Sequence, residues 1–488
     1  MKNYNFYLKE YGEIGHVEKI VTPIVEVAGL PSCTISEMVV FEDGSLGEVI
    51  AVDQEKATVL LYEHRNLDVG QRVARTGSGP TVKYSESLFG SMVDSFGDEI
   101  ALSTKSKSLE SDYVDLQIYT SASDISTRSV VSEPFITGVT LIDLMTPLGR
   151  GQRELLIGDR KTGKTSFALQ LLLAQKDKES VNIYACIGKN KSEVQYVKDF
   201  LIKNDLLKKT IIVASFSTSA VGKIYSTPYA AMSIAEKLSK EGKNVVLVLD
   251  DMLSHAKYYR EISLLANIFP GRDSYPGDMF YVHARLLERA GNFNNGTSIT
   301  CFPIVSTAND ELSGYIETNL MSMTDGHLFF DRGRFYEGLR PAVDPLLSVT
   351  RVGRQTQNSL RWAINRELNS FFVLHKKTGA FIHFGAEVSE GVKATIGMGD
   401  RLNILFAQPA QESYTLELQM LMLVLVWSNY LSNISGNDAL KKRLIEIKEF
   451  YESDKNFQNI VLAAVAESKN FNELIRNIIG AVAKFGIK

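Results

Sequence analysis

Long apolar runs are missing from this sequence. The longest fully apolar run, Met420 to Trp427, is far shorter than the roughly 20 residues that a membrane-spanning helix needs. The first residues, Met1 to Glu10, contain no apolar core of the length found in signal peptides. We therefore expect a cytosolic protein, and we expect any link to a membrane to go through partner subunits.

Cysteine and excess charge of one sign are also scarce. The 3 cysteines, Cys33, Cys186 and Cys301, lie far apart in the chain and show no metal-ligand spacing, so we expect small buried side chains in a reducing compartment. A formal net charge of −4 gives no overall attraction to nucleic acid or to an anionic membrane. A length of 488 residues suits two or three domains.

One glycine-bearing stretch carries the strongest chemical signal. Gly158-Asp-Arg-Lys-Thr-Gly-Lys-Thr165 follows the apolar run Leu155–Ile157 and precedes a helical pattern that starts at Ser166. This strand, loop and helix are the context that the G-x-x-x-x-G-K-[ST] phosphate loop needs. Its glycines let backbone N–H groups surround a phosphate at a helix N-terminus. The predicted nucleotide-binding residues of the loop are Gly158, Asp159, Arg160, Lys161, Thr162, Gly163, Lys164, Thr165 and Ser166.

Acidic residues at a second strand end suggest a magnesium site. Val245–Leu249 is an apolar run that ends in Asp250 and Asp251. In phosphate-loop proteins such an acid orients Mg²⁺ or its water shell, so we expect Thr165 and Asp250 at the metal. We expect Asp251 either to support the loop or to cap the following helix. Hydrolysis also needs a group that orients water, yet the stretch Ile187–Lys191 has no acid before Glu193. That stretch is either a solvent-facing turn or a sign that nucleotide is held without efficient hydrolysis.

Hydrophobic periodicity divides the chain into three zones. Residues 14–78 alternate in short runs broken by turns, which is typical of a small β-barrel or sandwich, and residues 80–135 resemble connecting structure. From about 136 to 355, short apolar strands alternate with helical patterns and predict a parallel sheet. The predicted strands are Leu155–Ile157, Val181–Ile187, Ile211–Ala214, Val245–Leu249 and Ser298–Val305. Helical patterns dominate after about 360, and Leu416–Trp427 is apolar nearly all round, as in a buried helix.

Several longer motifs resemble the α subunit of rotary F-type ATP synthases, over essentially the whole chain. They are Gly149–Thr165, Tyr275–Ala290, Phe335–Pro341 and Leu347–Gly353. The resemblance implies an α/β multidomain fold, with an N-terminal β-barrel at residues 1–79, a RecA-like nucleotide-binding domain at 80–358 and a C-terminal helical domain at 359–488. It also implies an alternating hexameric ring with catalytic β-type subunits around a γ-type central stalk, peripheral to a membrane only through other subunits.

The same resemblance implies roles for individual residues. The family's α subunit binds ATP or ADP with Mg²⁺ at a non-catalytic site and lends an arginine to the neighbouring catalytic site, and Arg351 matches that arginine. Composition alone would have favoured a surface salt bridge for Arg351. Phe335, Arg340 and Pro341 match the segment beside the base, and Gln408 matches one of two glutamines near the adenine.

The sequence also departs from the family pattern. Lys189 stands where the α subunit has glutamine and the catalytic subunit has glutamate, which favours a non-catalytic site. Lys161 replaces a usual glutamine, Ser306–Ala308 replaces Glu-Thr-Gln, and Ala410 replaces the second adenine-region glutamine. A short, dissimilar N-terminus departs from the pattern that meets the peripheral stalk. These departures suggest a divergent paralogue in a specialised ATPase assembly.

Two other functions remain open from the sequence. A self-sufficient hexameric ATPase, such as an export motor or helicase, would hydrolyse ATP alone, although Lys189 and the net charge of −4 count against it. A structural subunit would use nucleotide only to stabilise assembly by mass action, with no effect of Arg351 on rate. The first hypothesis, a non-catalytic ring subunit, does not exclude the structural one.

Overall fold

The computed structural model describes residues 2–63, 65–100, 112–383, 389–434 and 436–485. The chain forms two compact units, each built from several segments. The first contains residues 1–129, 179–306 and 311–324, and the second contains 130–178, 307–310 and 325–488. The predicted element types are confirmed: barrel strands come first, parallel strands and helices follow, and helices close the chain. The predicted domain boundaries stay predictions.

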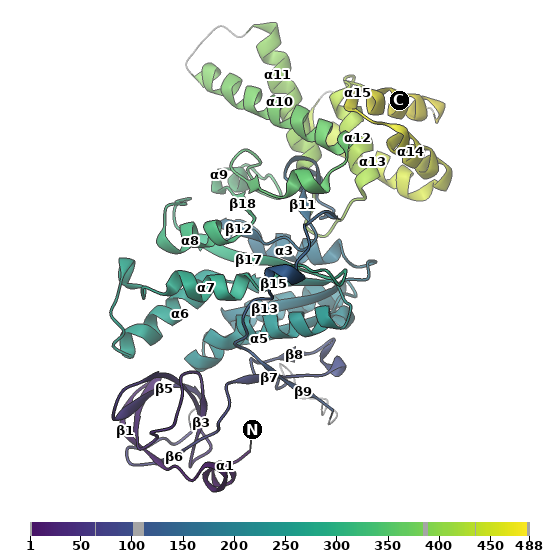
Figure 1. Ribbon diagram of the computed structural model, residues 1–488. Helices are drawn as coiled ribbons and strands as arrows, with labels where there is room; N and C mark the ends of the chain where they lie inside the picture. Colours follow the sequence, from purple (N-terminus) through teal and green to yellow (C-terminus); the bar gives the residue numbers. More distant parts are fainter. Residues whose placement is uncertain (1, 64, 101–111, 384–388, 435, 486–488) are drawn as a thin grey trace. The chain divides into compact units, whose positions relative to one another are not determined.

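A closed barrel of antiparallel strands opens the first unit (Figure 1). Its strand order is β1-β2-β5-β4-β3-β6. The strands are β1 (Gly15–Val21), β2 (Ile24–Ala28), β3 (Met38–Phe41), β4 (Leu46–Val52), β5 (Lys56–Glu63) and β6 (Arg72–Arg75). Val39, Val59 and Leu61 pack in its interior, as the alternation along the strands requires. Helix α1 (Tyr4–Tyr11) packs on the barrel through Tyr4, next to Val40.

Parallel strands form the centre of the first unit. The strands β17-β15-β13-β14-β8 lie in this order, and all neighbours are parallel. They are β8 (Met92–Val93), β13 (Val181–Lys189), β14 (Thr210–Phe216), β15 (Val245–Asp250) and β17 (Ser298–Thr307), with Thr307 itself assigned to the second unit. Because β15 and the residues of β17 up to Ser306 are buried throughout, they read as continuous apolar runs rather than alternating ones.

The remaining elements of the first unit surround these strands or join them. The longer helices are α4 (Lys191–Lys203), α5 (Val221–Lys240), α6 (Met252–Leu265), α7 (Met279–Leu287) and α8 (Tyr315–Met323). Short strands are β7 (Thr81–Tyr84), β9 (Val114–Gln117) and β16 (Gly291–Asn292), and short 3-10 helices are η1 (Glu86–Leu88), η2 (Ile125–Thr127), η3 (Leu207–Lys209) and η4 (Arg272–Ser274). The stretch expected as connecting structure therefore contains real strands, and β8 joins the parallel sheet.

The second unit begins with strands and one central helix. Strand β12 (Glu154–Asp159) pairs in parallel with β18 (Gly326–Phe330), and β18 pairs antiparallel with β19 (Val349–Thr350). Helix α3 (Lys164–Leu173) follows β12 after a short loop. The other elements here are β10 (Pro134–Phe135), α2 (Thr140–Met145), β11 (Leu148–Gly149), α9 (Arg332–Tyr336) and η5 (Gly353–Thr356).

Helices α10 to α15 complete the described part of the second unit, and α12 to α15 lie close together in Figure 1. They are α10 (Ser359–His383), α11 (Glu390–Phe406), α12 (Leu416–Trp427), α13 (Asn437–Ser453), α14 (Lys455–Glu467) and α15 (Phe471–Lys484). The Thr415 hydroxyl accepts a hydrogen bond from the Leu418 N–H and caps α12. Residues Leu418 to Val426 are all buried, because α11, α13, α14 and α15 all contact α12. The predicted buried helix is confirmed.

Candidate functional site

The loop between β12 and α3 has the backbone shape expected of a phosphate loop. Gly158 (φ 154°), Lys161 (φ 65°) and Gly163 (φ 95°) all have positive φ, a region that glycine adopts at low cost. A Cβ on Gly158 would lie 2.3 Å from the Phe330 carbonyl oxygen, so no larger residue fits there. The residue before α3 is Gly163, which has no side chain to cap the helix. The first N–H groups of α3 therefore suit an anionic ligand.

Lys164 lies inside this loop rather than at its surface. The residue is buried, and its Nζ donates to the carbonyl oxygens of Gly158 and Asp159, at 2.6 Å each. The Thr162 hydroxyl also donates to the Asp159 carbonyl oxygen, at 2.7 Å. The loop thus contains a buried ammonium group, and its contact with the outer phosphates, as in other phosphate loops, stays a prediction.

The side chain of Asp159 is held by residues at and just after the end of β17 and by Arg332 at the start of α9. Its Oδ1 accepts hydrogen bonds from the Thr307 hydroxyl (2.6 Å) and the Asp310 N–H (2.8 Å), and Arg332 lies 3.8 Å from Oδ2. Partial burial works to raise the pKa of Asp159, but these hydrogen bonds and the nearby cations outweigh it and lower the pKa. Asp159 is therefore an anchoring carboxylate that stays charged. Thr307, the middle residue of the stretch Ser306–Ala308, holds this carboxylate through its hydroxyl.

The other predicted loop residues differ in exposure. Arg160 and Lys161 are exposed, whereas Thr165 and Ser166 are partly buried in the first turn of α3. A threonine hydroxyl at this position is the ordinary first ligand that a phosphate loop offers to Mg²⁺. The role of Thr165 as a metal ligand stays a prediction.

The predicted base-side residues lie in the same unit as the loop. A Cβ built on Gly163 would be 4.0 Å from Cε2 of Phe335, which places this ring beside the loop. The Arg340 guanidinium lies over the Phe335 ring, 3.5 Å from its centroid, and donates to the Phe335 carbonyl oxygen at 2.7 Å. The next residue, Pro341, follows a cis peptide bond. An aromatic ring stacked on a guanidinium forms a planar platform next to the phosphate loop.

Gln408 is buried, and its amide is occupied by bonds within the protein. Its Oε1 accepts from the N–H and the hydroxyl of Thr140, both at 3.1 Å. Its Nε2 donates to the carbonyl oxygens of Gly138 (2.7 Å) and Glu412 (3.0 Å). The structure thus gives Gln408 a structural role that the sequence did not suggest, and its contact with adenine stays a prediction.

Asp250 belongs to the first unit, at the carboxyl end of β15. The Lys189 Nζ lies 2.7 Å from Asp250 Oδ1, and the Tyr184 hydroxyl donates to Oδ2 at 2.9 Å. Among the residues that the structure describes, no group of three or more His, Cys, Asp or Glu side chains suits a metal ion. The surroundings of Asp250 therefore resemble an ion pair more than an open metal shell, although its role at Mg²⁺ stays a prediction.

The residues around Lys189 differ from a solvent-facing turn. Strand β13 continues through Lys189, two residues beyond the predicted end at Ile187. The interpretation of this stretch as a solvent-facing turn was therefore wrong. Glu193 accepts from the Asn190 N–H at 3.1 Å and forms the capping box of α4. Its carboxylate is therefore engaged in capping the helix and is not available to orient water. Asp251 caps α6 by accepting from the Ser254 N–H at 2.6 Å, which is one of the two roles predicted for it.

Arg351 follows β19 and is exposed at the surface. Its backbone N–H donates to the Asp325 carbonyl oxygen at 2.9 Å, which fixes where the side chain leaves the chain.

Nearby, Glu154 is fully buried and accepts from Gln152 Nε2 at 2.6 Å. Burial and the Asp325 carboxylate raise the pKa of Glu154 well above its ordinary value. Sequence reasoning missed Glu154, although an acid that opens the apolar run of β12 is an unusual signal.

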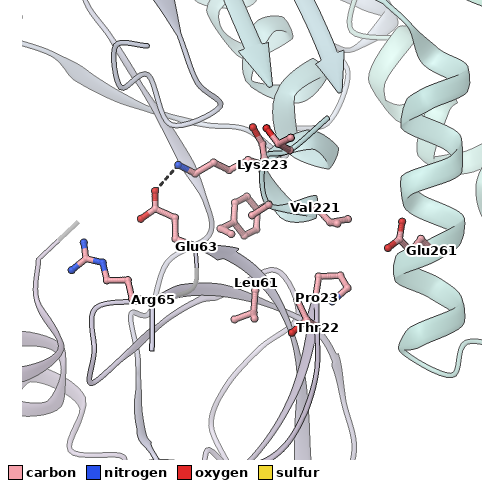
Figure 2. Close-up of a pocket in the computed structure, with 12 residues that line it drawn as sticks. Thr22, Pro23, Leu61, Glu63, Arg65, Val221, Lys223 and Glu261 are labelled. Atoms are coloured by element: carbon pink, nitrogen blue, oxygen red, sulfur yellow. Dashed lines mark hydrogen bonds and ion pairs between the residues drawn. The ribbon is translucent and has the colours of Figure 1, made fainter. Parts of the chain in front are cut away.

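A cavity of about 530 Å³ lies elsewhere in the first unit (Figure 2). Leu61 and Glu63 of β5 line it from the barrel, and Val221 and Lys223 line it from the start of α5. Lys223 forms ion pairs with Glu63 and with Asp94. None of the residues singled out from the sequence lines this cavity, so it is separate from the candidate site.

Comparisons with known proteins match most of the chain. Residues 138–350 match a family model described as the ATP synthase alpha/beta family, nucleotide-binding domain. "ATP synthase subunit alpha" of Rickettsia bellii is 34% identical over 483 residues, which cover 96% of this chain and 92% of that protein. "ATP synthase subunit alpha" of Clostridium kluyveri is 35% identical (86% and 83% covered), and "ATP synthase subunit alpha 2" of Nitrosospira multiformis is 37% identical (84% and 80%). Within the part of the chain described, no helix is long and apolar enough to cross a membrane.

Proposed function

Because this chain belongs to the ATP synthase alpha-subunit family, we propose that it binds ATP or ADP without hydrolysing it and completes the catalytic site of a neighbouring subunit. The observation that carries the proposal is the loop between β12 and α3. Its glycine backbone, its uncapped helix N-terminus and the buried Lys164 ammonium all suit a chain of phosphates.

The base and the metal would be met by residues around this loop. The platform of Phe335 and Arg340 would face the base, with Pro341 beside it. The Thr165 hydroxyl would hold Mg²⁺ together with the phosphates, and Asp250 stays the predicted acid of the metal shell. Bound Mg²⁺ would neutralise phosphate charge.

The proposed lack of hydrolysis rests on the residues at the end of β13. A water-orienting carboxylate or glutamine is needed for phosphoryl transfer to water. At the end of β13 the chain offers Lys189, whose ammonium pairs with Asp250, and the next acid, Glu193, is engaged in the capping box of α4. A protonated lysine cannot accept a proton from water, so this site would retain its nucleotide.

Arg351 would act outside this chain. Its exposed side chain leaves the surface directly after the β18–β19 pair, as an arginine donated in trans requires. An arginine supplied to a neighbour's phosphates is worth about 10³–10⁵ in rate in well-studied systems. The partners would be catalytic β-type subunits in an alternating ring and a γ-type central stalk, with any membrane contact made through other subunits.

The test is ATP hydrolysis by the purified chain, first alone and then with its β-type partner. We expect no turnover alone and strong turnover after reconstitution. Arg351→Ala should lower the reconstituted rate by about 10³-fold or more while ATP binding by this chain is retained. Arg443→Ala, which removes a partly exposed guanidinium paired with Glu446 in α13, is the control and should keep the rate. Lys164→Ala should lose ATP binding by the chain.

Other outcomes would favour the alternative functions. Robust turnover by the chain alone, lost in Lys164→Ala, would identify a self-sufficient motor and contradict the role given to Lys189. ATP-dependent ring assembly with wild-type turnover in Arg351→Ala would identify a structural subunit. The first result would overturn the non-catalytic role of this chain, and the second would overturn the in-trans role of Arg351.

A further inference from the structure

Three residues of the second unit lie side by side across neighbouring strands. Glu154 of β12 pairs with Gly326 of β18, and Gly326 in turn pairs with Thr350 of β19. The middle residue of this row has no side chain. A Cβ built on Gly326 would lie 2.5 Å from Oε2 of Glu154 and 2.3 Å from the Val349 carbonyl oxygen. The Glu154 carboxyl group therefore lies over β18, in the space that a side chain at this position would fill.

Gln152 links this carboxyl group to Thr350. Its Oε1 accepts from the Gly149 N–H at 2.8 Å, which leaves the two hydrogens of Nε2 as donors. One bond runs to Oε2 of Glu154 at 2.6 Å and the other to the Thr350 hydroxyl at 3.1 Å. The Thr350 hydroxyl oxygen also accepts from the Gly353 N–H at 3.2 Å. Two donors thus hold this hydroxyl in place.

Arg351 leaves the chain directly after this held threonine. Its backbone N–H donates to the Asp325 carbonyl oxygen, and its side chain is exposed. By contrast, Glu154 and Gln152 are both 0% exposed. Hydrogen bonds in such a dry environment are stronger than those in water. The backbone from which the Arg351 side chain extends is therefore fixed by buried contacts on its inner side.

One atom of this cluster has no hydrogen-bond partner. Oε1 of Glu154 is buried and accepts no hydrogen bond within the part of the chain that the structure describes. Such an unpaired atom costs about 1–3 kcal/mol, and an apolar side chain in this wholly buried strand would avoid that cost. Stability alone does not explain an acid here. The positive charge of Arg351 works to lower the pKa of Glu154, although burial and Asp325 outweigh it and raise that pKa.

We propose that Glu154 is a positioning residue for Arg351. Through Gln152 it holds Thr350, and it thereby fixes the direction in which the arginine leaves the surface towards the phosphates of a neighbouring subunit. A charge that is oriented in advance stabilises a transition state better than one that must be oriented during the reaction. The inference rests on the proposed in-trans role of Arg351 and adds the residue that prepares this arginine.

The experiment measures kcat and KM for ATP of the complex reconstituted with the β-type partner. Glu154→Met keeps the size of the side chain but offers Gln152 no acceptor, so we expect kcat to fall about 10- to 100-fold and KM to change by less than about 2-fold. Glu154→Gln keeps an uncharged acceptor oxygen and should retain about half of the wild-type kcat or more. Glu133→Met, at an acid of the same unit that is 75% exposed, is the control and should keep both constants.

A double-mutant cycle with Arg351→Ala separates positioning from a general loss of structure. If Glu154 acts only through this arginine, Glu154→Met should lower kcat no further in the Arg351→Ala background. ATP binding by the chain alone should be the same for wild type and Glu154→Met, which reports that the second unit is folded. Thr350→Val removes only the hydroxyl that Gln152 holds and should reproduce the fall in kcat. This variant decides the question if Glu154→Met fails to fold.

The outcomes are distinguishable. Wild-type kcat in Glu154→Met or in Thr350→Val, or an equal fall of kcat in both backgrounds, would overturn the inference and leave the in-trans role of Arg351 intact. A fall in Glu154→Gln as large as that in Glu154→Met would also overturn it, because that variant retains the acceptor. Wild-type turnover in Arg351→Ala would instead overturn the proposed function and this inference with it.

Discussion

The hydroxyl of Tyr62 lies 2.6 Å from a carboxylate oxygen of Glu48, and both residues are buried in the first unit. Tyr119 donates to the same oxygen at 3.2 Å. Burial raises the pKa of Glu48 from its ordinary 4.5 to about 7, against the opposing effect of these hydrogen bonds. The barrel thus carries, on β4, an acid that keeps its proton near neutral pH.

Glu48 should make the first unit less stable as the pH rises. Between pH 4.5 and 7 the unfolded chain loses this proton while the folded chain keeps it. The stabilisation is therefore complete below the unfolded pKa and declines through this window, by about 3 kcal/mol for a shift of this size. Glu48→Gln should flatten this decline, which urea unfolding midpoints at pH 5 and pH 8 would measure.

The Glu48 experiment needs a control for other titrating groups and a control for the loss of a carboxylate. The buried His255 has a pKa lowered by burial from 6.5 to about 4, so it acts in the opposite direction over pH 4 to 6.5. The comparison of Glu48→Gln with wild type in the same buffers cancels that contribution. Glu133→Gln, at a side chain that is 75% exposed, should show the wild-type decline. An equal decline in Glu48→Gln and wild type would contradict the raised pKa.

Gln408→Leu should destabilise the second unit without a direct effect on the base. Leucine cannot hydrogen-bond, so the Thr140 N–H and the Gly138 carbonyl oxygen would lose their buried partner. Each buried group left unpaired costs about 1–3 kcal/mol, which urea unfolding would measure. Gln458→Leu is the control, because that amide is exposed in α14. If Gln408→Leu kept its stability but lost affinity for ATP and not for GTP, an adenine contact would be the better interpretation.

Gly158→Ala should abolish nucleotide binding. The added methyl group would meet the Phe330 carbonyl oxygen at 2.3 Å, so β12 and β18 could not keep their spacing at the start of the loop. Gly242 also has a positive φ, 89°, but a Cβ added there would have no neighbouring atom within 4 Å, so Gly242→Ala is the control. We expect this control to retain binding and to lose only about 1–2 kcal/mol of stability from its backbone strain. ATP binding by fluorescence or calorimetry would check both, and binding by Gly158→Ala would show that the loop tolerates the displacement.

Local patterns explain why much of the fold was predictable. The run Val245–Leu249 and helix α12 are recognisable because their neighbours in sequence are also their neighbours in structure. The phosphate loop is recognisable for the same reason, because its glycines and lysine lie within eight residues between one strand and one helix. The end of β13 was missed because Gly188 and Lys189 are polar or small, and only pairing with β14 and β15 extends the strand.

The sequence by itself determined the phosphate-loop motif and the order of strand and helix zones, because each depends on contiguous residues. The tertiary structure decided which charged groups meet. Lys189 reaches Asp250 only through the parallel register of β13 and β15, and Glu48 is buried only because its strand closes into a barrel against Tyr62 and Tyr119. Burial and ion pairing depend on distance in space, which a linear pattern of residue types does not encode.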